Sequence, residues 1–287
     1  MSCTAGDRRG LKERKGAGGR DHQRYTIAMT NSRREFLKIA SAGAACARLG
    51  FASEPTLGLI VPPANYEAPP EYHAMYPSGI RFLIAGLGLP SMTPAGYDSV
   101  IDKIVPAAEK LKKDGAQAIS IMGTSLTFYK GAAFNQKLQD SVRQATGLPV
   151  TSMSNGIVEG LRVAKARRVA VATAYNDEVT ERLNVFLRES GFEVVKSKGL
   201  GILLNIPQSA QDGLLEFSAG VKESAPTADS LLISCGGLRT LDLLAPLETR
   251  LKVPVVSSQP HGLWNAVQLL GLDARVQGYG SVLAKKV

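Results

Sequence analysis

Short apolar runs alternate with segments of helical periodicity along residues 53–287. In residues 97–113, for example, apolar side chains recur every three or four positions, and the segment ends at Asp114-Gly115. Apolar runs between such segments are typical of the buried strands of parallel α/β proteins. The predicted strands are residues 56–61, 81–85, 116–122, 149–153, 168–173, 192–196, 231–234 and 253–257. The predicted helices are residues 97–113, 134–145, 155–166, 177–190, 213–224, 241–251 and 262–270.

The pattern repeats in the second half of the chain. Residues 147–152 (GLPVTS) parallel residues 252–257 (KVPVVS), and a predicted helix follows each segment. The apolar runs that lead to Gly123 and Cys235 each precede these segments by one helix. We therefore predict an α/β fold of two pseudo-symmetric lobes, each a short parallel sheet flanked by helices, with the active site in the cleft between them. The expected bounds are residues 53–154 plus 258–287 for lobe 1 and 155–257 for lobe 2.

Positive charge is concentrated in residues 1–52, which hold 11 of the 34 Lys and Arg residues and 4 of the 25 Asp and Glu residues. The rest of the chain carries 23 basic and 21 acidic side chains, so most of the net charge of +9 belongs to the first segment. A nearly neutral body gives no support to nucleic-acid binding. No apolar run reaches the roughly 18 residues of a membrane-spanning helix.

Residues 32–38 (SRREFLK) resemble a twin-arginine export signal, and a mildly apolar run follows them. We expect residues 1–52 to be a leader that the twin-arginine export machinery recognises and that is removed near Ala52, so that the protein is periplasmic. Residues 1–28 precede Met29 and are expected to be disordered. The alternative is a chance arginine pair on an ordinary amphipathic helix.

Cys235 is the only cysteine that remains when the leader is set aside, because Cys3 and Cys46 lie within it. A single cysteine cannot form an internal disulfide, and in an oxidising compartment a free thiol is a liability. The presence of Cys235 therefore suggests that its thiol has a chemical function. A buried cysteine that acts as a small hydrophobic side chain is an equally good interpretation of the position alone.

No metal or cofactor site is predicted. His73 and His261 are too few and too scattered for a metal site, and no cluster of ligand-spaced Cys, His and Asp residues occurs in the sequence. No glycine-rich phosphate-binding loop follows the first predicted strand, which argues against nucleotides.

Three strand ends carry the candidate chemistry. Gly123, Tyr175 and Cys235 follow predicted strands, and ligands of parallel sheets bind beyond the carboxyl ends of the strands. The thiol of Cys235 has no counterpart at the matching Gly123, and this asymmetry favours proton transfer on one side only. Thr124 and Ser125 add two hydroxyls, for which helix capping is the structural alternative.

These residues belong to a wider pattern, in which residues 57–281 resemble the arylmalonate decarboxylases of the aspartate/glutamate racemase superfamily. The matching segments are residues 58–63 (GLIVPP), 86–89 (GLGL) with 93–94 (TP), 122–126 (MGTSL), 128–129 (FY) with 131–135 (GAAFN), 172–175 (ATAY), 234–238 (SCGGL) and 253–258 (VPVVSS). Because the segments occur in order, the resemblance is far more specific than any single motif. The leader is not part of the family pattern.

The resemblance implies a cofactor-free decarboxylation of 2-arylmalonates to 2-arylcarboxylic acids. It implies that Cys235 is the proton donor. It also implies that Thr124, Ser125 and Tyr175, with backbone amides near Ser125 and Gly236, hold the carboxylate that the product retains. The expected partner is therefore a small-molecule dicarboxylate, and no oligomeric state is predicted.

This chemistry needs two opposite environments. Loss of CO2 leaves an electron pair that passes into the retained carboxylate, and hydroxyl and amide donors stabilise the resulting enediolate. An apolar pocket favours loss of the other carboxylate as neutral CO2. Leu89, Met92 and Ile206 are candidates for its lining, or they are plain core, and Pro62-Pro63 would shape the aryl side. Gly123 and Gly236 would let the backbone approach the substrate.

Two alternatives remain open. A racemase or cis–trans isomerase of the same superfamily generally needs two facing thiols, and Gly123 removes one of them. A non-catalytic periplasmic binding protein for small acids also consists of two α/β lobes around a cleft. The combination of Cys235 with Thr124, Ser125 and Tyr175 argues against that second alternative.

Overall fold

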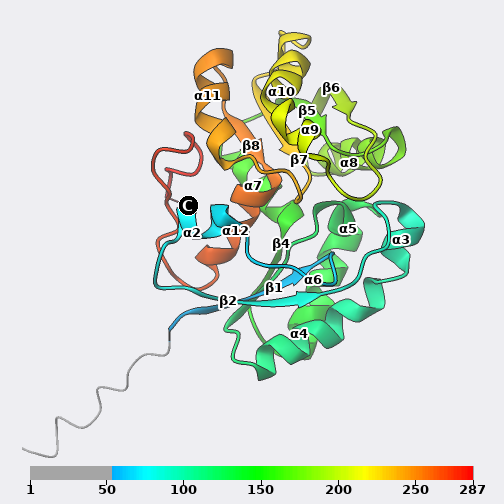
Figure 1. Cartoon of the computed structure of the whole chain (residues 1–287), viewed down its shortest axis with the longest axis vertical. Coiled ribbons are helices and arrows are strands. Elements are labelled where there is room, and N and C mark those ends of the chain that lie inside the picture. The colour runs from blue at the N-terminus through cyan, green and yellow to red at the C-terminus, as the bar shows by residue number, and fades with distance from the viewer. Residues whose placement is uncertain (1–53, 287) are drawn as a thin grey trace, which may run out of the picture. The chain divides into compact units, whose positions relative to one another are not determined.

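Two parallel four-stranded sheets organise residues 54–286, the part of the chain that this computed structural model describes (Figure 1). Sheet A has the strand order β2-β1-β3-β4 and sheet B the order β6-β5-β7-β8, so the two sheets share one topology. The strands are β1 (Thr56–Val61), β2 (Arg81–Gly86), β3 (Ala118–Ile121) and β4 (Val150–Ser152) in sheet A, and β5 (Arg168–Thr173), β6 (Glu193–Gly199), β7 (Ser230–Ser234) and β8 (Val255–Ser257) in sheet B. The predicted α/β fold with two similar lobes is confirmed.

The burial of the inner strands explains their apolar sequences. Every residue of β1, β3 and β7 is buried. The edge strands β2 and β6 are partly exposed, and β6 accordingly contains Glu193, Lys196 and Lys198. Strands that are covered on both faces need apolar side chains at every position, whereas an edge strand tolerates polar ones.

Helices connect the successive strands. They are α2 (Pro70–Met75), α3 (Pro94–Asp98), α4 (Ile104–Lys113), α5 (Thr124–Phe128), α6 (Ala132–Thr146), α7 (Met153–Val163), α8 (Asp177–Glu189), α9 (Gln208–Asp212), α10 (Leu214–Glu223), α11 (Leu241–Leu251) and α12 (Ser258–Gln268), with a 3-10 turn, η1, at Ile101–Lys103. Among the described residues, none of these helices is long and apolar enough to cross a membrane. The short helices α2, α5 and α9 were not predicted from the sequence pattern.

The prediction of one continuous helix over residues 97–113 is wrong. The structure divides this segment into the end of α3, the turn η1 and α4. Pro106 explains why α4 begins as late as Ile104, because a proline without an N–H group fits only the first turn of a helix. Val100 and Ile104 on either side of η1 are both buried, so the periodicity of the apolar residues continues across the break.

Helices α7 and α12 cross in backbone contact between the two sheets. Each begins directly after the last strand of one sheet and packs against the other sheet, α7 against β8 and α12 against β3 and β4. A Cβ atom at Gly156 would lie 2.6 Å from the Cα of Gly262 and 2.6 Å from the carbonyl oxygen of His261. Any larger side chain at Gly156 would push the helices apart, so this glycine fixes how closely the sheets approach.

The lobe boundaries at residues 154/155 and 257/258 stay a prediction. So does the export signal at residues 32–38, which lies outside the described residues together with the rest of residues 1–53.

His261 is the one titratable ring within this helix crossing. It is fully buried on α12, and its Cδ2 would lie 2.9 Å from a Cβ atom at Gly160 of α7. Its Nδ1 lies 3.1 Å from both the N and the O of Ser257, while its Nε2 has no partner among the described residues. Burial lowers the pKa of His261 from its usual 6.5 to about 3.

We expect this histidine to make the fold sensitive to acid. The unfolded chain binds a proton at His261 below its usual pKa of 6.5, whereas the folded chain binds it only near its pKa of about 3. The free energy of unfolding should therefore be highest above pH 6.5 and should fall by about 1.4 kcal/mol per pH unit between these two values. Thermal unfolding between pH 7.5 and pH 4 measures this, and the fall should be smaller in His261→Gln. An equal fall in His261→Gln would contradict this assignment.

Candidate functional site

The carboxyl ends of β3, β5 and β7 bring residues of both sheets to one place. Thr124 begins α5 after β3, Tyr175 follows β5, and Cys235 follows β7. Met153, the first residue of α7, links them: its Sδ accepts a hydrogen bond from the Thr124 hydroxyl at 2.7 Å and lies 3.0 Å from where a Cβ atom of Gly236 would be. The structure thus brings together Thr124, Tyr175, Cys235 and Gly236 from segments far apart in the sequence.

Cys235 lies in a dry environment that keeps its thiol protonated. The residue is only 5% exposed, and its backbone N–H donates to the Ser258 hydroxyl at 3.1 Å. Burial raises the pKa of the thiol above its usual value, although the N–H groups of Gly237 and Leu238 and the hydroxyl of Tyr175 oppose the shift. A protonated thiol is the state that a proton donor needs at neutral pH.

Tyr175 presents a buried hydroxyl to this thiol. The ring is fixed edge-on against Phe128 of α5, with the ring centroids 5.7 Å apart. The hydroxyl lies near Thr124 and Ser234 but forms no hydrogen bond of normal geometry with any described residue. Burial raises its pKa well above the usual value, and the neighbouring Cys235 adds to the shift. Tyr175 is therefore a neutral donor without an acceptor of normal geometry in residues 54–286.

Thr124 and Ser125 are the first two residues of α5, and both are buried. The first N–H groups of a helix have no acceptor within the helix, so these residues offer backbone donors as well as hydroxyls. Gly123 precedes them in an extended conformation and provides no side-chain cap. The capping interpretation of the Thr-Ser pair therefore finds no support, because neither hydroxyl caps α5.

Tyr97 is a further residue of the site, and sequence reasoning missed it. It lies on α3, is fully buried, and its hydroxyl has no hydrogen-bond partner of normal geometry among the described residues. Burial raises its pKa; the nearby Ser125 hydroxyl opposes the shift and the nearby Cys235 adds to it. Its ring packs against Tyr129, with centroids 5.0 Å apart. In the sequence, Tyr97 only continued an apolar periodicity, so nothing distinguished it from core.

Two of the residues proposed to shape the pocket lie beside glycines at the strand ends, Pro62 beside Gly123 and Ile206 beside Gly237. Pro62 is so close to Gly123 that a Cβ atom added to Gly123 would be 2.9 Å from the Cγ of Pro62. Ile206 Cδ1 lies 2.9 Å from where a Cβ atom of Gly237 would be, and the Cys235 sulfur is 4.0 Å from that same point. The site is therefore bounded by a proline ring next to Gly123 and by an isoleucine next to Cys235.

The other predicted lining residues lie in the loops of this region. Leu89 donates its N–H to the carbonyl of Pro62 at 2.8 Å, and Met92 donates its N–H to the carbonyl of Leu203 at 2.6 Å. The second bond joins the loop after β2 to the loop after β6, so the two lobes meet there. Pro63 is exposed, and no contact between its side chain and the thiol is seen. The roles of Leu89, Met92 and Pro63 stay predictions.

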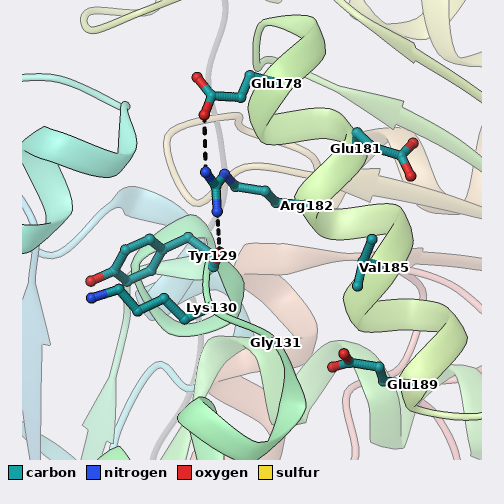
Figure 2. A pocket seen from close by; sticks show the side chains of 8 residues that line it. All are labelled: Tyr129, Lys130, Gly131, Glu178, Glu181, Arg182, Val185 and Glu189. Atoms are coloured by element: carbon teal, nitrogen blue, oxygen red, sulfur yellow. Dashed lines mark hydrogen bonds and ion pairs between the residues drawn. The ribbon is translucent and has the colours of Figure 1, made fainter.

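A charged surface groove between α8 and the turn after α5 lies beside the site (Figure 2). Arg182 of α8 donates to the Tyr129 carbonyl and to Glu178, each at 3.0 Å. Glu189, at the end of α8, accepts a hydrogen bond from the N–H of Ala132 at 2.7 Å. These bonds join the two lobes and hold the tyrosine that packs against Tyr97, so the groove is explained as a structural contact.

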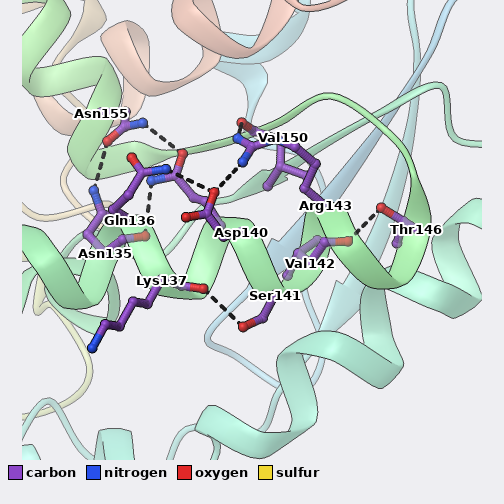
Figure 3. A network of polar contacts seen from close by, with 11 residues as sticks. Asn135, Gln136, Lys137, Asp140, Ser141, Val142, Arg143, Thr146, Val150 and Asn155 are labelled. Carbon is purple, nitrogen blue, oxygen red and sulfur yellow. Dashed lines mark hydrogen bonds and ion pairs between the residues drawn. The ribbon is translucent and has the colours of Figure 1, made fainter.

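A network of amide side chains occupies the outer edge of sheet A (Figure 3). Asn135 donates to Asn155 at 2.7 Å, Asn155 donates to Gln139 at 2.7 Å, and the Ser152 hydroxyl donates to Asn135 at 2.8 Å. The network ties α6 to the junction of β4 and α7, on which Met153 depends. Because these amides bind one another, the cluster is explained by packing.

Among residues 54–286, no group of three or more His, Cys, Asp or Glu side chains is arranged to hold a metal ion. The site instead consists of one thiol, several hydroxyls and the amides of a helix start. This set can donate protons and hydrogen bonds, which suits a reaction that develops negative charge on oxygen.

Comparison with known proteins places this chain in a family. The family model described as arylmalonate decarboxylase matches residues 57–283. An arylmalonate decarboxylase from Bordetella bronchiseptica is 48% identical over 232 residues, which cover 80% of this chain and 96% of that protein. A maleate isomerase from Nocardia farcinica is 25% identical over 240 residues, which cover 79% of this chain and 94% of that protein.

Solved structures agree with the sequence comparisons. A glycine-to-cysteine, cysteine-to-serine double variant of arylmalonate decarboxylase in a liganded form aligns with a TM-score of 0.75 and 46% identity, over 79% of this chain and 98% of that one. The Nocardia farcinica maleate cis–trans isomerase with a covalently bound succinylcysteine intermediate aligns with a TM-score of 0.73 at 20% identity, over 81% of this chain and 99% of that one, and shows the shared fold. The chain therefore belongs to the arylmalonate decarboxylase family and is an enzyme, a carboxy-lyase.

Proposed function

We propose that this enzyme decarboxylates 2-arylmalonates, with or without an additional 2-alkyl group, to 2-arylcarboxylic acids without a cofactor, through an enediolate that Cys235 protonates on one face. The observation that carries the proposal is a buried thiol, whose pKa burial raises, beside two buried tyrosine hydroxyls that have no acceptor of normal geometry among the described residues. Unpartnered buried donors are costly to a fold, and a substrate carboxylate would supply their missing acceptors.

The first step breaks the bond between the α-carbon and one carboxylate, and CO2 leaves. The bonding electron pair moves into the retained carboxylate and forms an enediolate with two negatively charged oxygens. Tyr97, Tyr175, Thr124, Ser125 and the amides near Ser125 and Gly236 are the proposed donors to these oxygens, and the Thr124 hydroxyl would exchange its bond to the Met153 sulfur for one to the substrate. Preorganised donors of this kind contribute about 3–4 kcal/mol each in comparable oxyanion sites.

The second step transfers the thiol proton to the α-carbon. The Cys235 S–H bond breaks, a new C–H bond forms, and the enediolate becomes the carboxylate of the product. The thiolate then takes a proton from solvent. Because burial raises the pKa of Cys235, the thiolate is a strong base in this environment and is readily reprotonated.

The racemase and isomerase alternative would need a second acid–base group on the opposite face. Gly123 carries none, and the Pro62 ring occupies the space next to it. This geometry supports one-sided proton donation. The binding-protein alternative is set aside because the chain belongs to an enzyme family.

The thiol is tested by Cys235→Ser. Because a hydroxyl is a far weaker acid, turnover of phenylmalonate, followed as CO2 release, should fall by about 10²–10⁴-fold while the melting temperature stays near that of the wild type. Alkylation of Cys235 should inactivate the enzyme in the same way, and phenylmalonate should protect it. Substantial activity in the serine variant would mean that the proton comes from elsewhere.

The two unpartnered tyrosines are tested by Tyr97→Phe and Tyr175→Phe. Removing a donor to the enediolate should lower kcat/KM by about 10²–10³-fold, while the melting temperature should not fall, because the folded enzyme loses no hydrogen bond. The matched control is Tyr76→Phe. In the wild type, the Tyr76 hydroxyl donates a hydrogen bond to the Ala274 carbonyl at 2.7 Å. This control should lose about 1 kcal/mol of stability and keep its activity. A phenylalanine variant with wild-type kcat/KM would exclude that tyrosine as a donor.

The empty position at Gly123 is tested by moving the thiol. A wild-type enzyme with one donor should convert a prochiral malonate to one enantiomer in large excess. Gly123→Cys should give a less pure product and exchange of its α-hydrogen with solvent deuterium, at a reduced rate because Pro62 must shift. Gly123→Cys combined with Cys235→Gly should favour the mirror-image product. A racemic wild-type product, or unchanged handedness in the double variant, would contradict donation from one face.

A further inference from the structure

The loop from Cys235 to Leu241, which joins β7 to α11, is held in place by a carboxylate from the other lobe. Glu71 of α2, in the connection between β1 and β2, accepts the N–H of Thr240 at 2.8 Å and the N–H of Leu241 at 2.7 Å. Both bonds go to its Oε1. Thr240 does not cap α11 itself, because its hydroxyl lies 2.9 Å from that of Ser257. The start of α11 is therefore capped by the side chain of Glu71, a residue about 170 positions earlier in the sequence.

Further hydrogen bonds to this loop come from α9 and from the start of α12. Gln211 of α9 donates to the Gly237 carbonyl at 3.1 Å and accepts the N–H of Arg239 at 3.2 Å. Ser258 accepts the N–H of Cys235. Gln211 thus fixes the loop to its own lobe, and Ser258 fixes Cys235 to the start of α12, the helix that packs against sheet A. Glu71 is the contact that fixes the loop to the chain segment that begins at Pro62, on the Gly123 side of the site.

This placement of Glu71 carries a desolvation cost. Its Oε2 is buried without a hydrogen-bond partner among the described residues. Burial raises the pKa of Glu71; the N–H groups of Leu241 and Thr240 and the charge of Arg239 oppose the shift, whereas Asp242 adds to it. The phenols of Tyr66 and Tyr72 also face this carboxylate.

A local cap would stabilise the helix start at a smaller cost. In α8 the side chain of Asn176, directly before the helix, accepts the N–H of Val179 at 3.0 Å. Features that lower stability without a structural gain concentrate at functional sites. The long-range cap of α11 therefore calls for a functional explanation.

We propose that Glu71 is a positioning residue, which holds the Cys235 loop at a fixed distance from the hydroxyls and the proline ring of the opposite lobe. The inference rests on the proposed role of Cys235 as proton donor. Proton transfer to carbon requires a short and directed approach, and a displacement of about 1 Å can lower a rate by about 100-fold. A carboxylate that spans both lobes near the donor is suited to prevent such a displacement.

The test compares Glu71→Ala and Glu71→Gln with Glu248→Ala. Glu248 is a matched control, because it also accepts two backbone N–H groups, of Val255 at 3.0 Å and Ser281 at 2.8 Å, but belongs to the far end of α11. With phenylmalonate, Glu71→Ala should lower kcat by about tenfold or more and change KM by less than about threefold. With a prochiral arylmalonate, it should also reduce the enantiomeric excess of the product.

Glu71→Gln should retain most of the wild-type kcat and enantiomeric excess, because its amide oxygen can accept the same two bonds. Glu248→Ala should lower the melting temperature and leave both catalytic readouts unchanged. If Glu71→Ala does not fold, Glu71→Asp replaces it in the test. Its side chain is one methylene shorter than that of glutamate, and we expect the same loss of kcat and of enantiomeric excess. Wild-type kcat and enantiomeric excess in Glu71→Ala, or an equal loss of kcat in Glu248→Ala, would overturn the proposal.

A second readout does not depend on turnover. Alkylation of Cys235 by iodoacetamide, followed on its own peptide by mass spectrometry, should be several-fold faster in Glu71→Ala than in the wild type or in Glu248→Ala, because the loop opens more often. An unchanged alkylation rate would contradict the positioning role. An active Cys235→Ser would instead contradict the proposed proton donor, so the two failures are distinguishable.

Discussion

The close crossing of α7 and α12 is the contact on which the site depends. At Gly156 and Gly262 the two backbones approach so closely that neither helix can accept a larger side chain without moving the other. Met153 begins α7 next to this crossing, with its Cγ 2.8 Å from where a Cβ atom of Gly262 would be. The same side chain contacts Thr124 and Gly236 at the site. A displacement of the helices would therefore separate the thiol from the hydroxyls.

Rigidity of this kind allows the site to keep its donors unpartnered. The hydroxyls of Tyr97 and Tyr175 could gain hydrogen bonds if the surrounding chain relaxed, and the packed crossing opposes that relaxation. Burial meanwhile keeps these phenols and the Cys235 thiol neutral. In the proposed mechanism, these neutral hydroxyls would donate hydrogen bonds to the negatively charged oxygens of the substrate. Such preorganised donors are the arrangement expected of electrostatic catalysis.

The sequence predicted features that depend on local pattern and missed those that depend on distant contacts. Apolar runs identified the buried strands, and the ends of those runs identified Gly123, Tyr175 and Cys235. Tyr97 could not be recognised, because a tyrosine in an apolar periodicity looks like core. Glu71 gave no signal either, since its partners lie about 170 residues away in the chain. The break after α3 was also missed, because the buried positions continue across it.

The duplicated fold makes the difference between Gly123 and Cys235 chemically meaningful. Each residue follows the third strand of its sheet in sequence order, so the two positions are equivalent in topology but not in chemistry. A symmetric pair of thiols could remove a proton on one face of a planar intermediate and return it on the other. Replacing one thiol by a glycine and closing the space with the Pro62 ring leaves a single route for the proton. A decarboxylation needs only one proton, because the electron pair of the broken C–C bond stays on the remaining fragment and no base has to remove a proton. In the proposed mechanism the asymmetry would therefore remove the deprotonation that racemises the product, while the forward reaction keeps the one acid that it needs.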